Sequence, residues 1–339
     1  MKEIPVEILD GLARSYGTAA SELVYFQGGH AWSDGVLYEY PTEEGSYILK
    51  IMEMPEAEVE DRLQTMKGRL EFVRFFGDRG IPIVYPEPSV QGGLYAVEQG
   101  PDQTVVAYTY RKREGKPLFK HPREEHEDLF ALWGKTMGRM HAAAAEYPVW
   151  QTLPGDPEGM LLGWENEWRF FDSFCKDDEV REQWRALKRQ LDELPQERDG
   201  FGFTHNDLHI ENLLFSQGEI TVLDFDVACP HWFACDLAIA LYSIFTYAAN
   251  GTLERPPADP QWLKKVAARF LEEYESEYPL APYWRQRLNL FLHYRRMLLF
   301  TIFSPELIRQ DSERHEEWRS RILENAPFPD WEPDQSWTL

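Results

Sequence analysis

The chain has 339 residues, of which 43% are hydrophobic and 14% aromatic. This composition supports a folded core and argues against an intrinsically disordered chain. The formal net charge is -23 at pH 7, and so acidic a surface disfavours a nucleic-acid partner because it repels phosphate backbones.

The first third of the chain is rich in predicted strands. Residues 3–16 predict a short helix, because hydrophobic residues recur on one face. A polar, glycine-containing stretch over 28–35 separates two strand candidates, and residues 56–79 predict a longer amphipathic helix. Gly80 and Pro82 end that helix. The predicted strands cover 23–26, 36–40, 46–52, 83–85, 93–98 and 104–110.

From residue 120 onward the chain is predicted to be mainly helical. Asp259 can cap a helix that begins at Pro260, and Ser304-Pro305 opens the last helix. The predicted helices cover 124–145, 164–175, 178–194, 260–278, 282–303 and 305–325. A run of strands followed by a run of helices indicates an α+β fold. We divide it into two lobes, residues 1–107 and 108–339.

One short stretch of the helical part contains two predicted strands, 212–215 and 220–225. Residues 216–219 between them form a hairpin loop that contains a glycine. This register places residue 212 opposite residue 223. Asn212 and Asp224 should therefore leave the hairpin at the same open end.

These polar residues are the types that phosphoryl transfer requires. An amide oxygen beside a carboxylate forms an oxygen-rich site that suits Mg²⁺. Asp207 lies in the loop that leads into the first strand, where it can accept the proton of an attacking hydroxyl. The pattern His205-x-Asp207-x-x-x-x-Asn212, followed by Asp224, has the spacing of kinase catalytic machinery.

The same segment resembles the Brenner-type motif of aminoglycoside phosphotransferases, choline kinases and their small-molecule kinase relatives, the phosphotransferase enzyme family. The family pattern is His-x-Asp-x-His-x-x-Asn and then Asp-x-Asp, which this chain matches at His205, Asp207, His209, Asn212, Asp224 and Asp226. Asp236-Leu-Ala resembles a further family motif. The chain departs from the family at Asn206 and Glu211, where glycine is common, and in its irregular glycine loop.

The resemblance implies a protein-kinase-like fold with a small β-rich N-terminal lobe that binds nucleotide and a larger, mainly helical C-terminal lobe that binds the acceptor. It implies ATP, with GTP as an alternative, and Mg²⁺. The implied residue roles are the catalytic base for Asp207, orientation of the loop for His205, metal binding for Asn212, Asp224 and Asp226, a structural brace for Asp236, phosphate binding for Lys50, and pairing with Lys50 for Glu71. An ordinary edge lysine, a solvated helix face and a strand-end residue are the alternatives for Lys50, Glu71 and Asp226.

The resemblance also implies a small-molecule hydroxyl as the acceptor. An acidic chain with many aromatic residues favours an amine-bearing alcohol of the aminoglycoside, choline or amino alcohol type, and homoserine or a sugar is the alternative. Five aromatic residues offer a wall for a cationic ligand, with core packing as the alternative. They are Trp164, Trp168, Trp232, Tyr283 and Trp284.

Three other functions remain as alternatives. A protein kinase is disfavoured because the chain lacks an Ala-Pro-Glu motif and room for an activation loop. A metal-dependent hydrolase would need three ligands around zinc from the His205–Asp226 stretch. A non-catalytic nucleotide-binding protein is disfavoured because every expected catalytic position is filled.

The expected surroundings are reducing and aqueous. The chain has three cysteines with no Cys-x-x-Cys pair, so we expect three free thiols rather than a disulfide framework. The N-terminus lacks the basic start and apolar run of a signal peptide, and no apolar stretch reaches membrane-spanning length. We therefore expect a cytoplasmic protein with no membrane partner.

Overall fold

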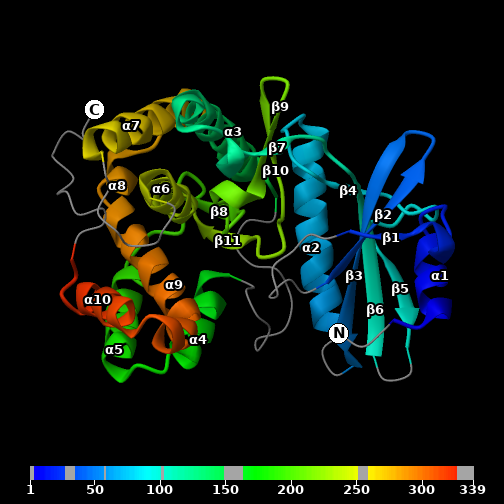
Figure 1. Cartoon of the computed structure of the whole chain (residues 1–339), viewed down its shortest axis with the longest axis horizontal. Coiled ribbons are helices and arrows are strands. Elements are labelled where there is room, and N and C mark those ends of the chain that lie inside the picture. Colours follow the sequence, from blue (N-terminus) through cyan, green and yellow to red (C-terminus); the bar gives the residue numbers. More distant parts are fainter. Residues whose placement is uncertain are drawn as a thin grey trace. The chain divides into compact units, whose positions relative to one another are not determined.

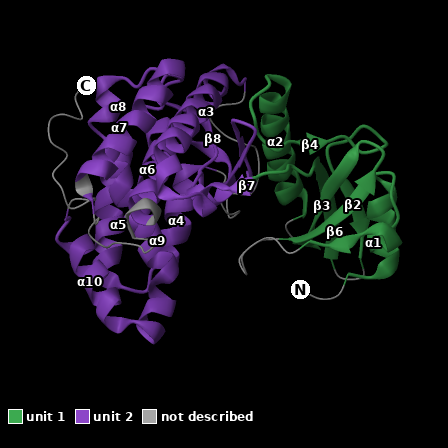
Figure 2. Cartoon of the chain, turned by 45° about the horizontal axis from the view of Figure 1, so that its top comes forward, with its two compact units in different colours: residues 1–115, 153–159 green, residues 116–152, 160–339 purple. Residues whose placement is uncertain are grey.

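The computed structural model describes residues 4–26, 35–56, 59–100, 103–148, 163–250 and 259–326 (Figure 1). The described residues form two compact units, one that ends at Gly115 and one that begins at Lys116 (Figure 2). This division falls later than the expected lobe boundary at 107/108. The reason is that the last long strand of the first unit pairs with its neighbour as far as Arg111.

The first unit is built on an antiparallel sheet. Its strand order is β1-β2-β3-β6-β4, and β5 also pairs with β6. The strands are β1 (Val24–Tyr25), β2 (Val36–Thr42), β3 (Gly45–Pro55), β4 (Pro86–Glu87), β5 (Ala96–Gln99) and β6 (Gln103–Arg111), and the helices are α1 (Val6–Arg14), the 3₁₀ turn η1 (Ala20–Glu22) and α2 (Val59–Asp78). The long helix and the main strands confirm the prediction, whereas the strand predicted at 83–85 lies at 86–87 instead.

Alternate residues of β3 face opposite sides of this sheet. Leu49 and Ile51 belong to a hydrophobic cluster with residues of α1, and Met54 belongs to a second cluster with residues of α2. Because side chains alternate along a strand, Lys50 shares the α2 face with Met54. Lys50 is 6% exposed, so its charge is almost completely removed from water.

The second unit is mainly helical. Its helices are α3 (His126–Glu146), α4 (Trp164–Phe174), α5 (Asp178–Leu191), α6 (Phe233–Asn250), α7 (Pro260–Glu277), α8 (Pro282–Arg285), α9 (Leu288–Gln310) and α10 (Ser312–Leu323), with 3₁₀ turns η3 (Leu118–Lys120), η4 (Arg123–Glu125) and η5 (Ile210–Asn212). Two small sheets accompany them, β10-β9-β7 and β11-β8. Their strands are β7 (Lys116–Pro117), β8 (Phe201–Thr204), β9 (Leu213–Ser216), β10 (Glu219–Val222) and β11 (Cys229–Trp232).

The end of the chain differs from the prediction. We expected a break at Ser304-Pro305, but α9 continues through Pro305 to Gln310. The break comes instead at Asp311, whose side chain accepts a hydrogen bond from the Arg314 N–H and caps α10. A proline inside a helix costs one backbone hydrogen bond, and packing of the apolar α9 offsets that loss.

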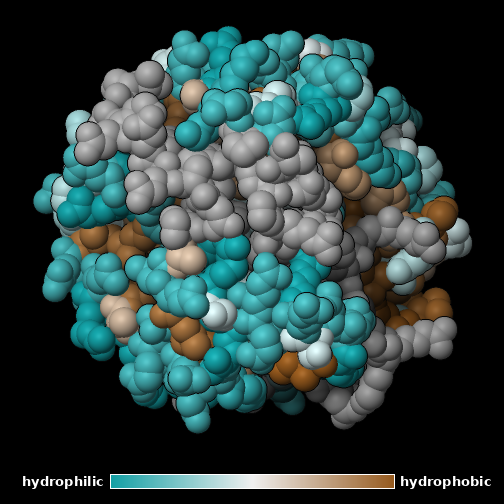
Figure 3. Space-filling view, turned by 60° about the vertical axis from the view of Figure 1, so that its left-hand side comes forward, coloured by the Kyte–Doolittle hydropathy of each residue, from teal (hydrophilic) through white to brown (hydrophobic). Residues whose placement is uncertain are grey.

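Close helix packing forms the core of this unit. Gly134 and Gly138 of α3 face the backbone of α7, where a Cβ atom on Gly134 would lie only 2.0 Å from the Phe270 carbonyl oxygen. The residues of α6 from 233 to 246 are all buried, as expected of a helix that is hydrophobic all round. No helix in the described ranges is long and apolar enough to cross a membrane. On the face drawn in Figure 3, hydrophilic residues predominate and hydrophobic ones are scattered.

Candidate active site

The hairpin at the site is formed by β9 and β10. Phe215 pairs with Ile220, and the Leu223 N–H donates to the Asn212 carbonyl oxygen at 2.9 Å, which confirms the predicted register. The turn itself is shorter than expected and consists of Gln217 and Gly218. Both have positive φ angles, 51° and 86°, as the favoured two-residue hairpin turns require.

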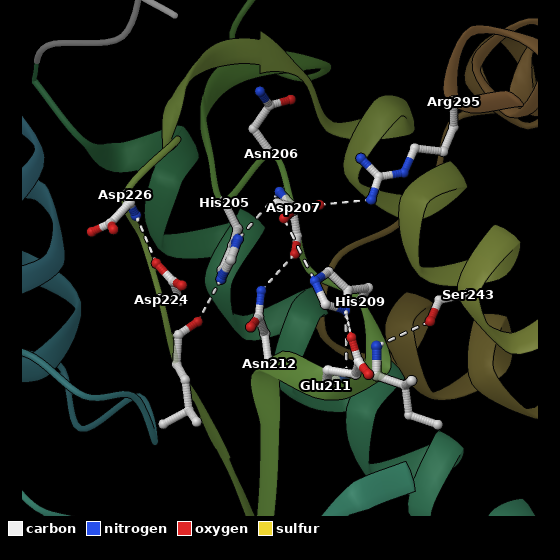
Figure 4. A network of polar contacts seen from close by, with 12 residues as sticks. His205, Asn206, Asp207, His209, Glu211, Asn212, Asp224, Asp226, Ser243 and Arg295 are labelled. Atoms are coloured by element: carbon white, nitrogen blue, oxygen red, sulfur yellow. Dashed lines mark hydrogen bonds and ion pairs between the residues drawn. The ribbon is translucent and has the colours of Figure 1, made fainter. Parts of the chain in front are cut away.

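The two candidate metal ligands lie at the open end of this hairpin (Figure 4). Asn212 donates its side-chain N–H to the Asp207 carbonyl oxygen at 3.0 Å, so the Asn212 Oδ1 is the atom available to a cation. Asp224 is exposed and has a positive φ of 59°, and its carboxylate accepts the Asp226 N–H at 3.3 Å. The structure thus brings Asn212, Asp224 and Asp226 to one end of the hairpin.

His205 connects the loop to the hairpin. Its Nε2 lies 2.8 Å from the Leu223 carbonyl oxygen and donates to it, and its Nδ1 accepts the Asp207 N–H at 3.3 Å. The ring also packs on Phe225, with centroids 4.5 Å apart. One imidazole therefore links the backbone of Asp207 to the residue that precedes Asp224.

Asp236 fixes the backbone of the loop that carries Asp207 through buried hydrogen bonds. Its carboxylate is fully buried and accepts the N–H of His205 at 2.9 Å and that of Asn206 at 2.7 Å. His141 lies 3.3 Å from the same carboxylate, and its other ring nitrogen lies 2.9 Å from the Tyr274 hydroxyl. Burial opposes ionisation, but these donors hold the pKa of Asp236 below its usual value.

Asp207 lies between two basic side chains. Its Oδ1 accepts a hydrogen bond from Arg295 Nη2 at 2.7 Å, and its Oδ2 lies 3.5 Å from His209 Nε2. Burial would raise the pKa of Asp207, but the charge of Arg295 and the contact with His209 lower it well below the usual range. These contacts thus favour the carboxylate form of Asp207, which can receive a proton or orient a hydroxyl.

Two further residues at this loop were not found from the sequence. Glu167 of α4 is 3% exposed and accepts hydrogen bonds from the Asn206 side chain and the Tyr294 hydroxyl. Asn206 has a positive φ of 63°, a backbone conformation that favours glycine. Burial raises the pKa of Glu167. Glu167 shares a helix face with buried Trp164 and Phe171, and a charged residue at such an apolar-face position was the available signal.

The donor set of the site fits magnesium better than zinc. Within the described ranges, no three His, Cys, Asp or Glu side chains gather closely enough to hold a metal ion. Both ring nitrogens of His205 are engaged by the backbone, so it has no free position for zinc. Mg²⁺ commonly takes one or two protein ligands and completes its shell with substrate phosphates and water. Asn212 and Asp224 can provide those protein ligands.

In the first unit, Glu71 does not pair with Lys50 as expected. Glu71 lies on α2 with a side chain that is 51% exposed, and its carboxylate lies 3.6 Å from Lys67 one turn earlier. The face of α2 that carries Glu71 therefore points to solvent. The glycine loop from Gly28 to residue 34 lies outside the described residues.

Three of the five aromatic candidates for a ligand wall pack in the core, which is the other role considered for each of them. Trp164, Trp232 and Trp284 are at most 4% exposed and belong to the core of the second unit. The Trp168 ring N–H donates to the Trp184 carbonyl oxygen at 2.9 Å. Only Tyr283 is exposed, at 38%.

Comparison with known proteins identifies the family. The model of the phosphotransferase enzyme family matches residues 32–285, which is more than half of the chain. The chain belongs to the phosphotransferase enzyme family. It is a small-molecule kinase with the protein-kinase-like fold of that family. None of the curated proteins matches it significantly.

Solved structures agree with this fold. An amicoumacin kinase in complex with AMP-PNP, Ca²⁺ and Ami is similar with a TM-score of 0.80 and 24% identity, over 96% of this chain and 95% of that one. A microcompartment-associated aminopropanol kinase has a TM-score of 0.61 and 17% identity, over 94% of each chain. The choline kinase of Streptococcus pneumoniae has a TM-score of 0.55 and 15% identity, over 89% of this chain and 94% of that one.

Proposed function

We propose that this protein uses ATP and Mg²⁺ to phosphorylate a hydroxyl group of a small, amine-bearing alcohol. The observation that supports this most directly is the arrangement at the hairpin end. The amide oxygen of Asn212 and the carboxylate of Asp224 lie at one open end. The loop that carries Asp207 is hydrogen-bonded there to Asn212 and Leu223, the residues next to the two strands. A base beside a magnesium site is the arrangement that phosphoryl transfer to a hydroxyl needs.

In the proposed reaction, the acceptor hydroxyl oxygen attacks the γ-phosphorus of ATP and the bond to the bridging oxygen of ADP breaks. Asp207 orients the hydroxyl and takes its proton. A magnesium ion held by Asn212 and Asp224 would neutralise phosphate charge. His205 and Asp236 act through the backbone, because their hydrogen bonds fix the position of the loop. By resemblance to the family, Lys50 is the candidate for phosphate binding.

Similar structures support the choice of acceptor. The aminopropanol kinase and the choline kinase are named for amino alcohols, and a further neighbour with a TM-score of 0.58 is a spectinomycin phosphotransferase in complex with ADP and its antibiotic. An acidic chain attracts cationic ligands at long range, which favours the same class. Homoserine or a sugar is the second candidate. The three cysteines are buried and free, in keeping with the cytoplasm, where we place this ATP-dependent reaction.

The test is a panel of hydroxylated metabolites with ATP and Mg²⁺. Amino alcohols, choline, aminoglycosides, homoserine and sugars are incubated separately with the purified chain, ADP release is followed, and mass spectrometry identifies the phosphorylated product. We expect turnover on an amine-bearing alcohol. Nucleotide binding without transfer to any member of the panel would leave a non-catalytic nucleotide-binding protein as the better account.

Two matched variants then test the residue assignment. Asp207→Asn keeps the size of the side chain but removes its proton acceptor, and we expect turnover to fall by about 10² or more while ATP affinity stays within about twofold. The control is Asp192→Asn, which changes an exposed aspartate that pairs with Lys188. Unchanged turnover in the Asp207 variant would refute its role as the base.

A further inference from the structure

Helix α9 contacts the catalytic loop although it lies beyond the part of the chain that the family model covers. The match ends at residue 285, and α9 runs from Leu288 to Gln310. Its Arg295 places Nη2 at 2.7 Å from Asp207 Oδ1, as Figure 4 shows. The two residues are 88 positions apart in the chain, so only the tertiary fold brings them together.

The arginine of this ion pair is largely shielded from water, whereas the carboxylate is partly exposed. The side chain of Arg295 is 10% exposed and that of Asp207 is 35% exposed. An arginine in such surroundings makes a short, charge-assisted hydrogen bond, which is stronger and more directional than a surface pair. The contact occupies one oxygen of the carboxylate and leaves Oδ2 on the side of His209.

The neighbouring residue on α9 makes a second connection to the same loop. Tyr294 donates its hydroxyl to Glu167, and Glu167 accepts from the side chain of Asn206. Consecutive residues of one helix therefore hold consecutive residues of the loop, Asn206 and Asp207. A helix that only filled space would not need two polar contacts at this point.

We propose that Arg295 is a positioning residue for the base: it binds Oδ1 of Asp207, fixes the orientation of the carboxylate, and leaves Oδ2 to receive the acceptor hydroxyl. This inference rests on the proposed function.

The experiment compares Arg295→Gln and Arg295→Lys with the unchanged protein on the acceptor found by the panel. For the glutamine variant we expect kcat to fall by about tenfold to a hundredfold, because the reacting carboxylate is no longer fixed. The KM for ATP should stay within about twofold, so the loss should fall on kcat and not on nucleotide binding. Lysine keeps the charge and can donate one hydrogen bond to Oδ1, so Arg295→Lys should restore part of kcat.

The control is Arg296→Gln on the same helix. Arg296 is also buried, but it donates to the Ala326 carbonyl oxygen and not to Asp207. The Arg296→Gln change should reduce stability and leave kcat within about twofold. An unchanged kcat in Arg295→Gln would overturn the positioning role, and so would an equal fall of kcat in Arg296→Gln.

A second measurement needs no acceptor. Urea unfolding of Asp207→Asn, Arg295→Gln and the double variant forms a double-mutant cycle. We expect Arg295→Gln to lower the unfolding midpoint less in the Asp207→Asn background than in the original chain. If Arg295→Gln lowers the midpoint equally in both backgrounds, the two side chains do not interact, and the inference is overturned. If the two changes are coupled but the protein transfers phosphate to no acceptor, the ion pair is confirmed and the proposed function is overturned.

Discussion

Replacement of Asp236 should be among the most damaging changes in the second unit. Its buried carboxylate accepts the N–H groups of His205 and Asn206, with His141 alongside. In Asp236→Asn, one amide oxygen can still accept, but the new NH₂ group faces a backbone N–H. A buried donor without a partner costs about 1–3 kcal/mol, and the lost charge adds to this, so we expect about 3 kcal/mol. Asp236→Ala removes every acceptor and should cost about 4–5 kcal/mol.

Urea unfolding followed by tryptophan fluorescence measures this cost. Fully buried tryptophans of the second unit, Trp133, Trp184, Trp232 and Trp318, supply the signal. With a slope of about 2–3 kcal/mol per M urea, a loss of 3 kcal/mol lowers the midpoint by about 1–1.5 M. Asp192→Asn on the surface should stay within about 0.5 kcal/mol.

The pH dependence gives a further check on Asp236. The folded-state pKa lies below the unfolded value of about 3.9, so the carboxylate stabilises the fold above that pH. This stabilisation is lost as the pH falls toward the folded pKa, and the difference between the original chain and Asp236→Asn should narrow below about pH 4. A midpoint shift under about 0.3 M at pH 7 would refute the reasoning.

Three further predictions concern stability and reactivity. Gln217→Asn should stabilise the chain by about 0.5 kcal/mol in the same urea assay, because Asn-Gly suits a turn with two positive φ angles; a loss of stability would contradict that turn type. Glu167→Gln should cost about 1–2 kcal/mol. The Asn206 side chain can turn over so that its Oδ1, which finds no partner among the described residues, accepts from the new amide, but its NH₂ group then loses its acceptor; a cost above about 3 kcal/mol would show that the charge is needed. The three buried thiols, two of which have pKa values raised by burial, should react with a thiol reagent at pH 8 only after unfolding, and rapid labelling of the native chain would contradict their burial.

Local patterns made much of the fold and part of the site predictable. The helix at α2, the α+β class and the hairpin register all follow from contacts between residues close in the chain, and such contacts leave a periodic signal. The motif also named His205, Asp207 and Asn212, because these residues lie within one loop. These three residues come together without any contact between distant parts of the chain.

Contacts that depend on packing between distant segments were not predictable. Nothing around Arg295 in the sequence points to Asp207, although two arginines inside an apolar helix were a signal that they have buried partners. The break expected at Pro305 failed because proline marks a helix end only where packing does not favour continuation. The pairing expected between Glu71 and Lys50 failed because the sequence does not show which face of α2 turns toward the sheet. Glu71 lies on the solvent face, one turn from Lys67.

The dependence of the loop on α9 has a consequence for how the protein is made. Synthesis proceeds from the N-terminus, and local elements can form as they leave the ribosome. The hairpin and the loop with Asp207 therefore emerge well before the arginine that fixes the carboxylate, which follows 88 positions later. Such a nascent chain can form the end of the hairpin early, but under the proposed mechanism it gains full activity only when translation has delivered α9.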